Sequence, residues 1–244
     1  MNLIISLTFI ILFSCSAIET KSVVGRSKQS YLQQEEGGKF LLEKETGIDK
    51  AGLYVLKRRV ATLQEDNVLE RTISFSKFKK LDKDIKGLYP VKSQAVFILE
   101  NEKYISSMKM SEKSLNVTLT SPDEKWNGVR TFKLPKNTLN FCYLYKIIDC
   151  AKVTGFLDLA SEKGFGSMPV TLVIETYPFF SDQFLNIDEQ PFLSGELVYD
   201  GKNKSGEHRL SLNLANQVIF YFLDKDYGLL RTSWVAQNFN QLLR

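Results

Sequence analysis

The residues best suited to chemistry are scarce in this chain of 244 residues, which contains one histidine and three cysteines. His208 follows Glu207 and shares one strand face with alternating leucines, so we interpret it as a residue at the end of a strand. A catalytic histidine would need a nucleophile and an orienting acid beside it, and no motif supplies them. So few nitrogen and sulfur ligands also argue against a zinc site. The sequence therefore predicts no cofactor, no metal and no enzyme activity, and a secreted hydrolase is the least favoured function.

Two glycine-containing segments match functional motifs only in part. Residues 164–168 (Gly-Phe-Gly-Ser-Met) lack the last glycine of a nucleophile elbow, and we expect a loop there. Residues 224–228 (Asp-Lys-Asp-Tyr-Gly) contain a fragment of a calcium-loop pattern without the terminal glutamate. We expect this segment to be a turn.

Cys142 and Cys150 could form a disulfide in an oxidising compartment. A continuous helix across both residues would separate them by ~12 Å along its axis, whereas a disulfide needs Cα atoms within ~7 Å. The bridge and the helix exclude each other unless the chain reverses between the two cysteines, and the sequence leaves this choice open.

The N-terminal segment determines the expected compartment. Leu3–Phe13 is an uncharged apolar run of about a dozen residues, shorter than the ~20 residues of a membrane-spanning helix and typical of a secretory signal. The residues around Cys15 (Leu-Phe-Ser-Cys) resemble a bacterial lipobox. We therefore expect lipidation of Cys15 and a cell-envelope protein that is anchored to a membrane and faces the periplasm. The alternative is cleavage after Ser16 or Ala17, which would give a soluble periplasmic or secreted protein.

The remaining chain is expected to form one domain. The whole sequence then divides into a signal peptide (1–15), a polar tether (16–39) and a single β-rich domain (40–244). The net charge is +4, and positive and negative side chains are interspersed, which is not typical of nucleic-acid binding.

Beyond residue 40, β-forming runs alternate with turns. We expect a hairpin from Leu53–Leu63 and Val68–Phe78, a loop at 79–90 and a meander over 95–120. Further strands are expected at 129–134, at 153–159 and between 170 and 236. The sum is a mainly β fold of about ten strands, antiparallel, in a curved sheet or an incompletely closed β-barrel.

One central helix is expected to fill the curved sheet. Pro135 interrupts the strand pattern, Asn137 or Thr138 can cap a helix, and apolar residues then recur at helical spacing from Leu139 to Ile148. The same segment also alternates as a strand would, so periodicity leaves both interpretations open. The proline and the capping residue favour the helix.

Two segments carry a resemblance to known proteins. They are residues 134–145 (Leu-Pro-Lys-Asn-Thr-Leu-Asn-Phe-Cys-Tyr-Leu-Tyr) and, loosely, 226–231 (Asp-Tyr-Gly-Leu-Leu-Arg). With the order of expected elements over about 40–234, the chain resembles the LolA/LolB lipoprotein-carrier superfamily and a related family of uncharacterised bacterial periplasmic domains. The resemblance implies a curved, unclosed barrel around an apolar cavity that holds an acyl chain or another hydrophobic ligand.

We expect the lining of such a cavity to include Phe141 and Tyr145 from the central segment, and Phe220 and Phe222 from the apolar run 218–223. The expected function is that of an exported envelope lipoprotein that binds a hydrophobic or lipid-like ligand, with the membrane as its partner through the anchor and with no nucleic-acid partner. The alternative is a structural or assembly component that binds another envelope protein through a sheet edge or the aromatic segment 179–191.

Overall fold

The computed structural model describes residues 27–35, 38–81, 85–136, 140–179, 190–214 and 217–244. The expected signal peptide, Cys15 and the first part of the expected tether lie outside the described residues. So do Asn137 and Thr138, the expected helix caps, and residues 180–189 of the aromatic segment 179–191.

The described strands form a single 15-stranded sheet in which the first described strand, β1, lies next to the last, β15. Strand β1 (Ser27–Glu35) pairs antiparallel with both β2 and the last strand, β15 (Phe239–Leu243). The other strands on the β1 side are β2 (Gly38–Ile48), β3 (Tyr54–Thr62), β4 (Val68–Lys80), β5 (Lys86–Leu99), β6 (Glu102–Met110), β7 (Ser114–Thr120) and β8 (Gly128–Lys133). They form an antiparallel meander that ends at β8.

The second half of the sheet continues from β15 to the other edge, β9. Its strands are β9 (Phe141–Tyr143), β10 (Gly166–Val173), β11 (Phe192–Lys202), β12 (His208–Leu214), β13 (Gln217–Leu223) and β14 (Leu229–Trp234). These pairs are antiparallel except for β9 with β10, which is parallel. The connection between β9 and β10 contains two helices, as a parallel crossover requires.

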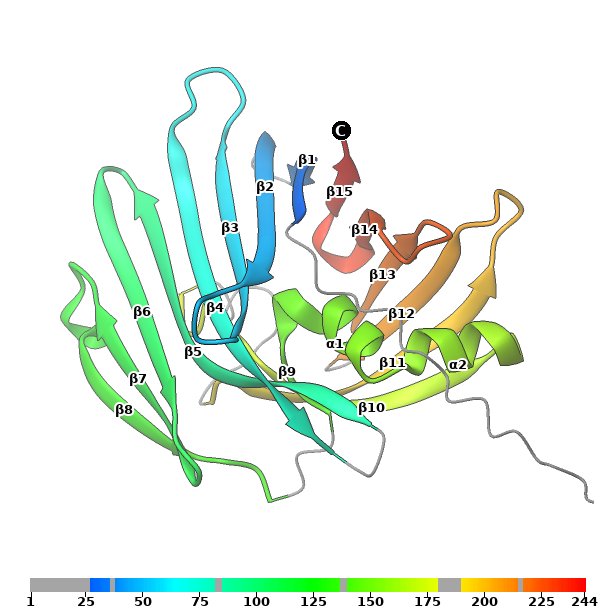
Figure 1. Cartoon of the computed structure of the whole chain (residues 1–244). Helices are drawn as coiled ribbons and strands as arrows, with labels where there is room; N and C mark the ends of the chain where they lie inside the picture. The colour runs from blue at the N-terminus through cyan, green and yellow to red at the C-terminus, as the bar shows by residue number, and fades with distance from the viewer. Residues whose placement is uncertain (1–26, 36–37, 82–84, 137–139, 180–189, 215–216) are drawn as a thin grey trace, which may run out of the picture.

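The two helices are short and lie inside the curve of the sheet. Helix α1 (Ile147–Val153) packs against β5, and α2 (Phe156–Lys163) packs against β10 and β11. Gly155 separates them at φ +75°, a conformation that glycine adopts at little cost. Strand β9 also lies against β5. In Figure 1, strands β2–β8 stand on one side of α1 and β11–β14 on the other, so the sheet curls around the helix without closing.

Alternation of side chains fixes which face of the sheet is buried. In β7, Leu115, Val117 and Leu119 are buried, whereas the residues between them are exposed, the pattern of an antiparallel strand with one solvent face. The predicted mainly β fold, antiparallel and unclosed, is confirmed. The described part of the chain contains fifteen strands instead of about ten, and two short helices instead of one central helix.

Four segments differ from the sequence prediction in the strand regions. Residues 166–168, expected in a loop, begin β10. Residues 27–35 and 38–39, expected as tether, form β1 and the start of β2. Their polar composition misled the prediction, because the buried face of β1 includes a glutamine, Gln33. The expected loop at 79–90 is shorter, since β4 continues to Lys80 and β5 begins at Lys86. Strand β15 was not expected.

The central segment differs as well. Phe141–Tyr143 is a strand, Leu144–Lys146 is a 3-10 turn, and the α-helix begins at Ile147. The expected helix from 139 to 148 is therefore wrong over most of its length. The expected strand at 153–159 is also wrong, because α2 begins at Phe156. The β-forming residues there are outweighed by burial of one helical face against the sheet.

Candidate functional site

A cavity of about 380 Å³ lies between the two halves of the sheet and the segment that leads into α1. This volume is within the ~300–1,000 Å³ typical of ligand sites. Most of the lining is apolar and comes from β2–β5, from residues 144–148 and from β13–β15. The apolar lining residues are Phe40, Leu42, Leu56, Val60, Leu69, Phe97, Leu99, Leu144, Ile147, Ile148, Ile174, Ile219, Leu229, Trp234 and Phe239. The cavity is partly open to the surface, so a ligand can enter.

The structure places one of the four predicted cavity residues in the main cavity. Tyr145 lines it, whereas Phe141 lines a separate pocket of about 40 Å³. On β13, Ile219 and Tyr221 line the cavity. The alternation of a strand turns the neighbouring residues, Phe220 and Phe222, to the other face. The sequence did not distinguish the two faces of β13, because this strand is apolar on both faces.

The polar part of the lining is centred on a buried ion pair. Arg58 on β3 donates to the carboxylate of Glu70 on β4, to Gln33 Oε1 at 3.2 Å and to the Tyr145 hydroxyl at 3.3 Å. Its guanidinium also lies 4.4 Å from the centre of the Tyr145 ring. Burial opposes the charge of Arg58, but Glu70 and Tyr145 outweigh it and hold the arginine pKa above its ordinary value. The Thr72 hydroxyl donates to Glu70 Oε1 at 2.8 Å and fixes the glutamate.

These polar residues were missed by sequence reasoning. Arg58 lies in a run of three basic residues, 57–59. Such a run is typical of a solvent-exposed segment. Strand alternation was the available signal: Lys57 is exposed and pairs with Glu45, whereas Arg58 points into the cavity. Gln33 was missed because it lay in the expected tether.

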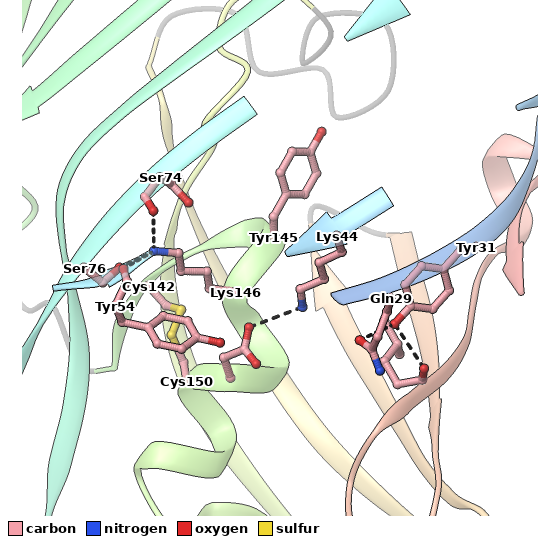
Figure 2. A network of polar contacts seen from close by, with 12 residues as sticks. Gln29, Tyr31, Lys44, Tyr54, Ser74, Ser76, Cys142, Tyr145, Lys146 and Cys150 are labelled. Atoms are coloured by element: carbon pink, nitrogen blue, oxygen red, sulfur yellow. Dashed lines mark hydrogen bonds and ion pairs between the residues drawn. A yellow bond between two sulfur atoms is a disulfide. The ribbon is translucent and has the colours of Figure 1, made fainter. Parts of the chain in front are cut away.

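Lys146 fastens the cavity-lining turn to the sheet. Its side chain is fully buried and donates to the carbonyl oxygens of Tyr54 and Ser74 and to Ser76 Oγ, each at 3.0 Å. Figure 2 shows these bonds reaching from the start of α1 to β3 and β4. Burial lowers the pKa of Lys146, and burial raises the pKa of Glu175, which accepts the Tyr145 amide N–H at 3.3 Å. The lysine therefore positions Tyr145 at the cavity wall.

A disulfide joins Cys142 and Cys150, with Cα atoms 6.5 Å apart (Figure 2). The distance is compatible with a bridge because the chain is a strand and a 3-10 turn before α1 begins, so no continuous helix spans the two cysteines. The disulfide ties β9 to α1 on either side of the turn that lines the cavity.

The remaining chemical candidates have structural roles. His208 is buried, its Nδ1 lies 2.8 Å from the Tyr199 hydroxyl, and its ring contacts Tyr227. Burial lowers the pKa of His208, which favours the neutral ring. Asp224 Oδ1 accepts the backbone N–H groups of Asp226 and Gly228, which is a turn, as expected. Across the part of the chain that the structure describes, no group of three or more His, Cys, Asp or Glu side chains is placed to hold a metal.

Among the helices of the described segments, none has the length and apolar character needed to cross a bilayer.

Comparisons with known proteins bear on the fold. No family model matches this chain. No curated protein matches it. Among solved structures, the chain is similar to a β-barrel-like protein of the domain of unknown function DUF1849 from Brucella abortus, with 11% sequence identity, a TM-score of 0.50, and coverage of 90% of this chain and 95% of that one. At this identity the likeness shows the fold alone: a large, mostly antiparallel, barrel-like β-sheet.

Proposed function

We propose that this protein is an exported cell-envelope lipoprotein that binds a hydrophobic or lipid-like ligand in its curved sheet. The observation that carries the proposal is the apolar cavity of about 380 Å³, with a small polar cluster at Arg58. A mainly apolar pocket with a few fixed polar groups is the usual form of a small-molecule site. The signal-like Leu3–Phe13 and the lipobox-like context of Cys15 support the envelope location and the anchor.

The relation to the LolA/LolB carrier superfamily belongs to the same proposal. A carrier has to enclose an apolar chain and release it again. The unclosed sheet and the partly open cavity are suited to this, because neither requires the sheet to unfold for a ligand to leave. We propose binding, rather than catalysis, as the role of the site.

The two tryptophans of the chain provide a direct test. Trp234 lines the cavity, whereas Trp126 is outside the lining and packs against Phe179. A long-chain alcohol that carries a bromine atom quenches indole fluorescence only on contact. We expect it to quench the emission of the Trp126→Phe variant, which retains Trp234, and to leave the Trp234→Phe variant close to its starting intensity.

The same alcohol without bromine is the control for changes in environment, and thermal unfolding shows that both variants fold. Equal quenching of the two variants would place the alcohol elsewhere on the surface. An absence of quenching in both would contradict the proposed binding site.

A second function is suggested by the exposed edge of the sheet. Strand β8 is an end strand of the described sheet, and Val129 on it is 70% exposed. An open edge can accept a strand from another protein. This supports, as the second candidate, a structural or assembly component of the envelope, and a stable co-purifying protein without bound lipid would favour it.

A further inference from the structure

The positive charges of the cavity wall are already engaged within the protein. Among the described lining residues the cations are Lys44 and Arg58. Lys44 Nζ lies 3.3 Å from Asp149 Oδ2, a contact that Figure 2 draws as a dashed line. Arg58 is bound by Glu70, by Gln33 and by the Tyr145 hydroxyl. An anionic head group would therefore have to compete with a buried carboxylate for either cation, at a high cost.

A second carboxylate stands beside the Arg58 ion pair. Glu35, at the end of β1, lines the same cavity. Burial raises the pKa of Glu35, although Arg58 and a hydrogen bond from Gln33 act in the opposite direction. One guanidinium thus faces two carboxyl groups, Glu35 and Glu70. Among the described lining residues at this end of the cavity, two carboxyl groups stand against one guanidinium.

Strand register adds a row of uncharged polar groups. Tyr221 on β13 pairs with Thr232 on β14, Thr232 pairs with Gln241 on β15, and Gln241 pairs with Gln33 on β1. All four residues line the cavity. Their hydroxyl and amide groups can both accept and donate hydrogen bonds, so the row offers polar contacts without a charge. The row crosses the pairing of β15 with β1 and ends at Gln33, which Arg58 contacts.

We propose that the cavity selects amphiphiles whose head group donates hydrogen bonds and carries no negative charge, such as long-chain amines and alcohols, over carboxylates of the same chain length. The inference rests on the proposed function, since it names the class of ligand for that site. The selectivity comes from repulsion as much as from attraction. A carboxylate head group would lie near Glu35 and Glu70, and the described lining residues offer it no cation that is not already paired. An ammonium or hydroxyl group finds acceptors there.

The test uses dodecylamine, dodecanol and dodecanoate as competitors of the brominated alcohol on the Trp126→Phe protein, each below its micelle-forming concentration. We expect the amine and the alcohol to restore Trp234 emission at concentrations at least about tenfold lower than dodecanoate does, because only the dodecanoate head group is repelled by Glu35 and Glu70. Equal or better competition by dodecanoate would overturn the inference.

Substitution of Glu35 tests whether this residue causes the preference for the amine over the carboxylate. The Glu35→Gln variant keeps the shape and removes the charge, so the advantage of dodecylamine over dodecanoate should shrink about tenfold. The matched control is Glu196→Gln on β11, which is exposed and outside the lining; it changes the net charge equally and should leave the preference unchanged. An unchanged preference in Glu35→Gln would overturn the role of this residue.

The outcomes also separate the two proposals. If the brominated alcohol fails to quench Trp234 in the unsubstituted cavity, the proposed function itself fails. The alcohol could quench Trp234 while the three competitors act at equal concentrations or in the opposite order of strength. That result would support the binding site and contradict the head-group selectivity.

Discussion

Replacement of Arg58 by methionine should lower the free energy of unfolding by about 3–5 kcal/mol. The substitution leaves Glu70 buried in the cavity wall without the guanidinium that compensates it, and it also removes the contacts to Gln33 and Tyr145. A buried charge that loses its partner costs far more than the pair contributes, because the remaining carboxylate is neither solvated nor paired. Urea unfolding, followed by circular dichroism, measures the effect.

Two further variants show whether pairing is the cause. Replacement of both Arg58 and Glu70 by methionine should recover most of the loss, since an apolar pair leaves no uncompensated charge. The adjacent Arg59 pairs with Glu43 and Asp66 on the other face of β3, where it is partly exposed. Arg59→Met should therefore cost only ~0–1 kcal/mol. A small loss in Arg58→Met, or a double variant as unstable as the sum of its single variants, would contradict the described pair.

Replacement of Cys142 and Cys150 by alanine should lower the free energy of unfolding by about 2–3 kcal/mol. The disulfide closes a short loop, with a sequence separation of 8, and restricts the unfolded chain accordingly. Alanine is preferred to serine because both positions are buried and a hydroxyl there would lack a partner. Urea unfolding with and without a reductant measures the effect.

The reductant supplies an internal control for the disulfide. It should destabilise the unsubstituted protein to about the level of the alanine variant, and it should leave the variant itself unchanged. An equal stability of the two proteins under non-reducing conditions would mean that the bridge contributes nothing to the fold.

Much of the strand pattern could be predicted from the sequence, because alternation reports burial directly. In β7, alternating Leu115, Val117 and Leu119 mark the buried face without ambiguity. Strand β1 shows where this signal fails. Tyr31 and Gln33 are its buried residues, and a glutamine that faces a cavity cannot be told from one that faces solvent. A polar strand at a ligand site therefore looks like a tether.

The strand predicted at 153–159 was wrong for a different reason. Val153, Thr154 and Phe156 are β-forming residues, yet the chain turns at Gly155 and then buries Leu157 and Ala160 on one side of α2. Those two residues are spaced as a helix requires, but a helix of two turns offers too few repeats for the period to be recognised. Tertiary contact with β10 and β11 decides the structure there.

The lining of the cavity was the part of the structure that could be predicted least well from the sequence. The sequence suggests an apolar interior, but the register of β13 determines whether Phe220 or Ile219 faces it, and a shift by one residue exchanges the two faces. Arg58 and Glu70 come together only through the pairing of β3 with β4. Such a pair, formed from residues on different strands, carries no local motif.

Native mass spectrometry of the full protein, extracted from the membranes of the cells that produce it, tests the central claim most directly. We expect a non-covalent ligand mass under native conditions that disappears on denaturation. The cavity-filling variant Ile219→Trp should lose most of this ligand, whereas Phe220→Trp, one residue along β13 on the opposite face, should retain it. An unsubstituted protein that carries no ligand, or ligand retained equally by both variants, would contradict a binding role for the cavity.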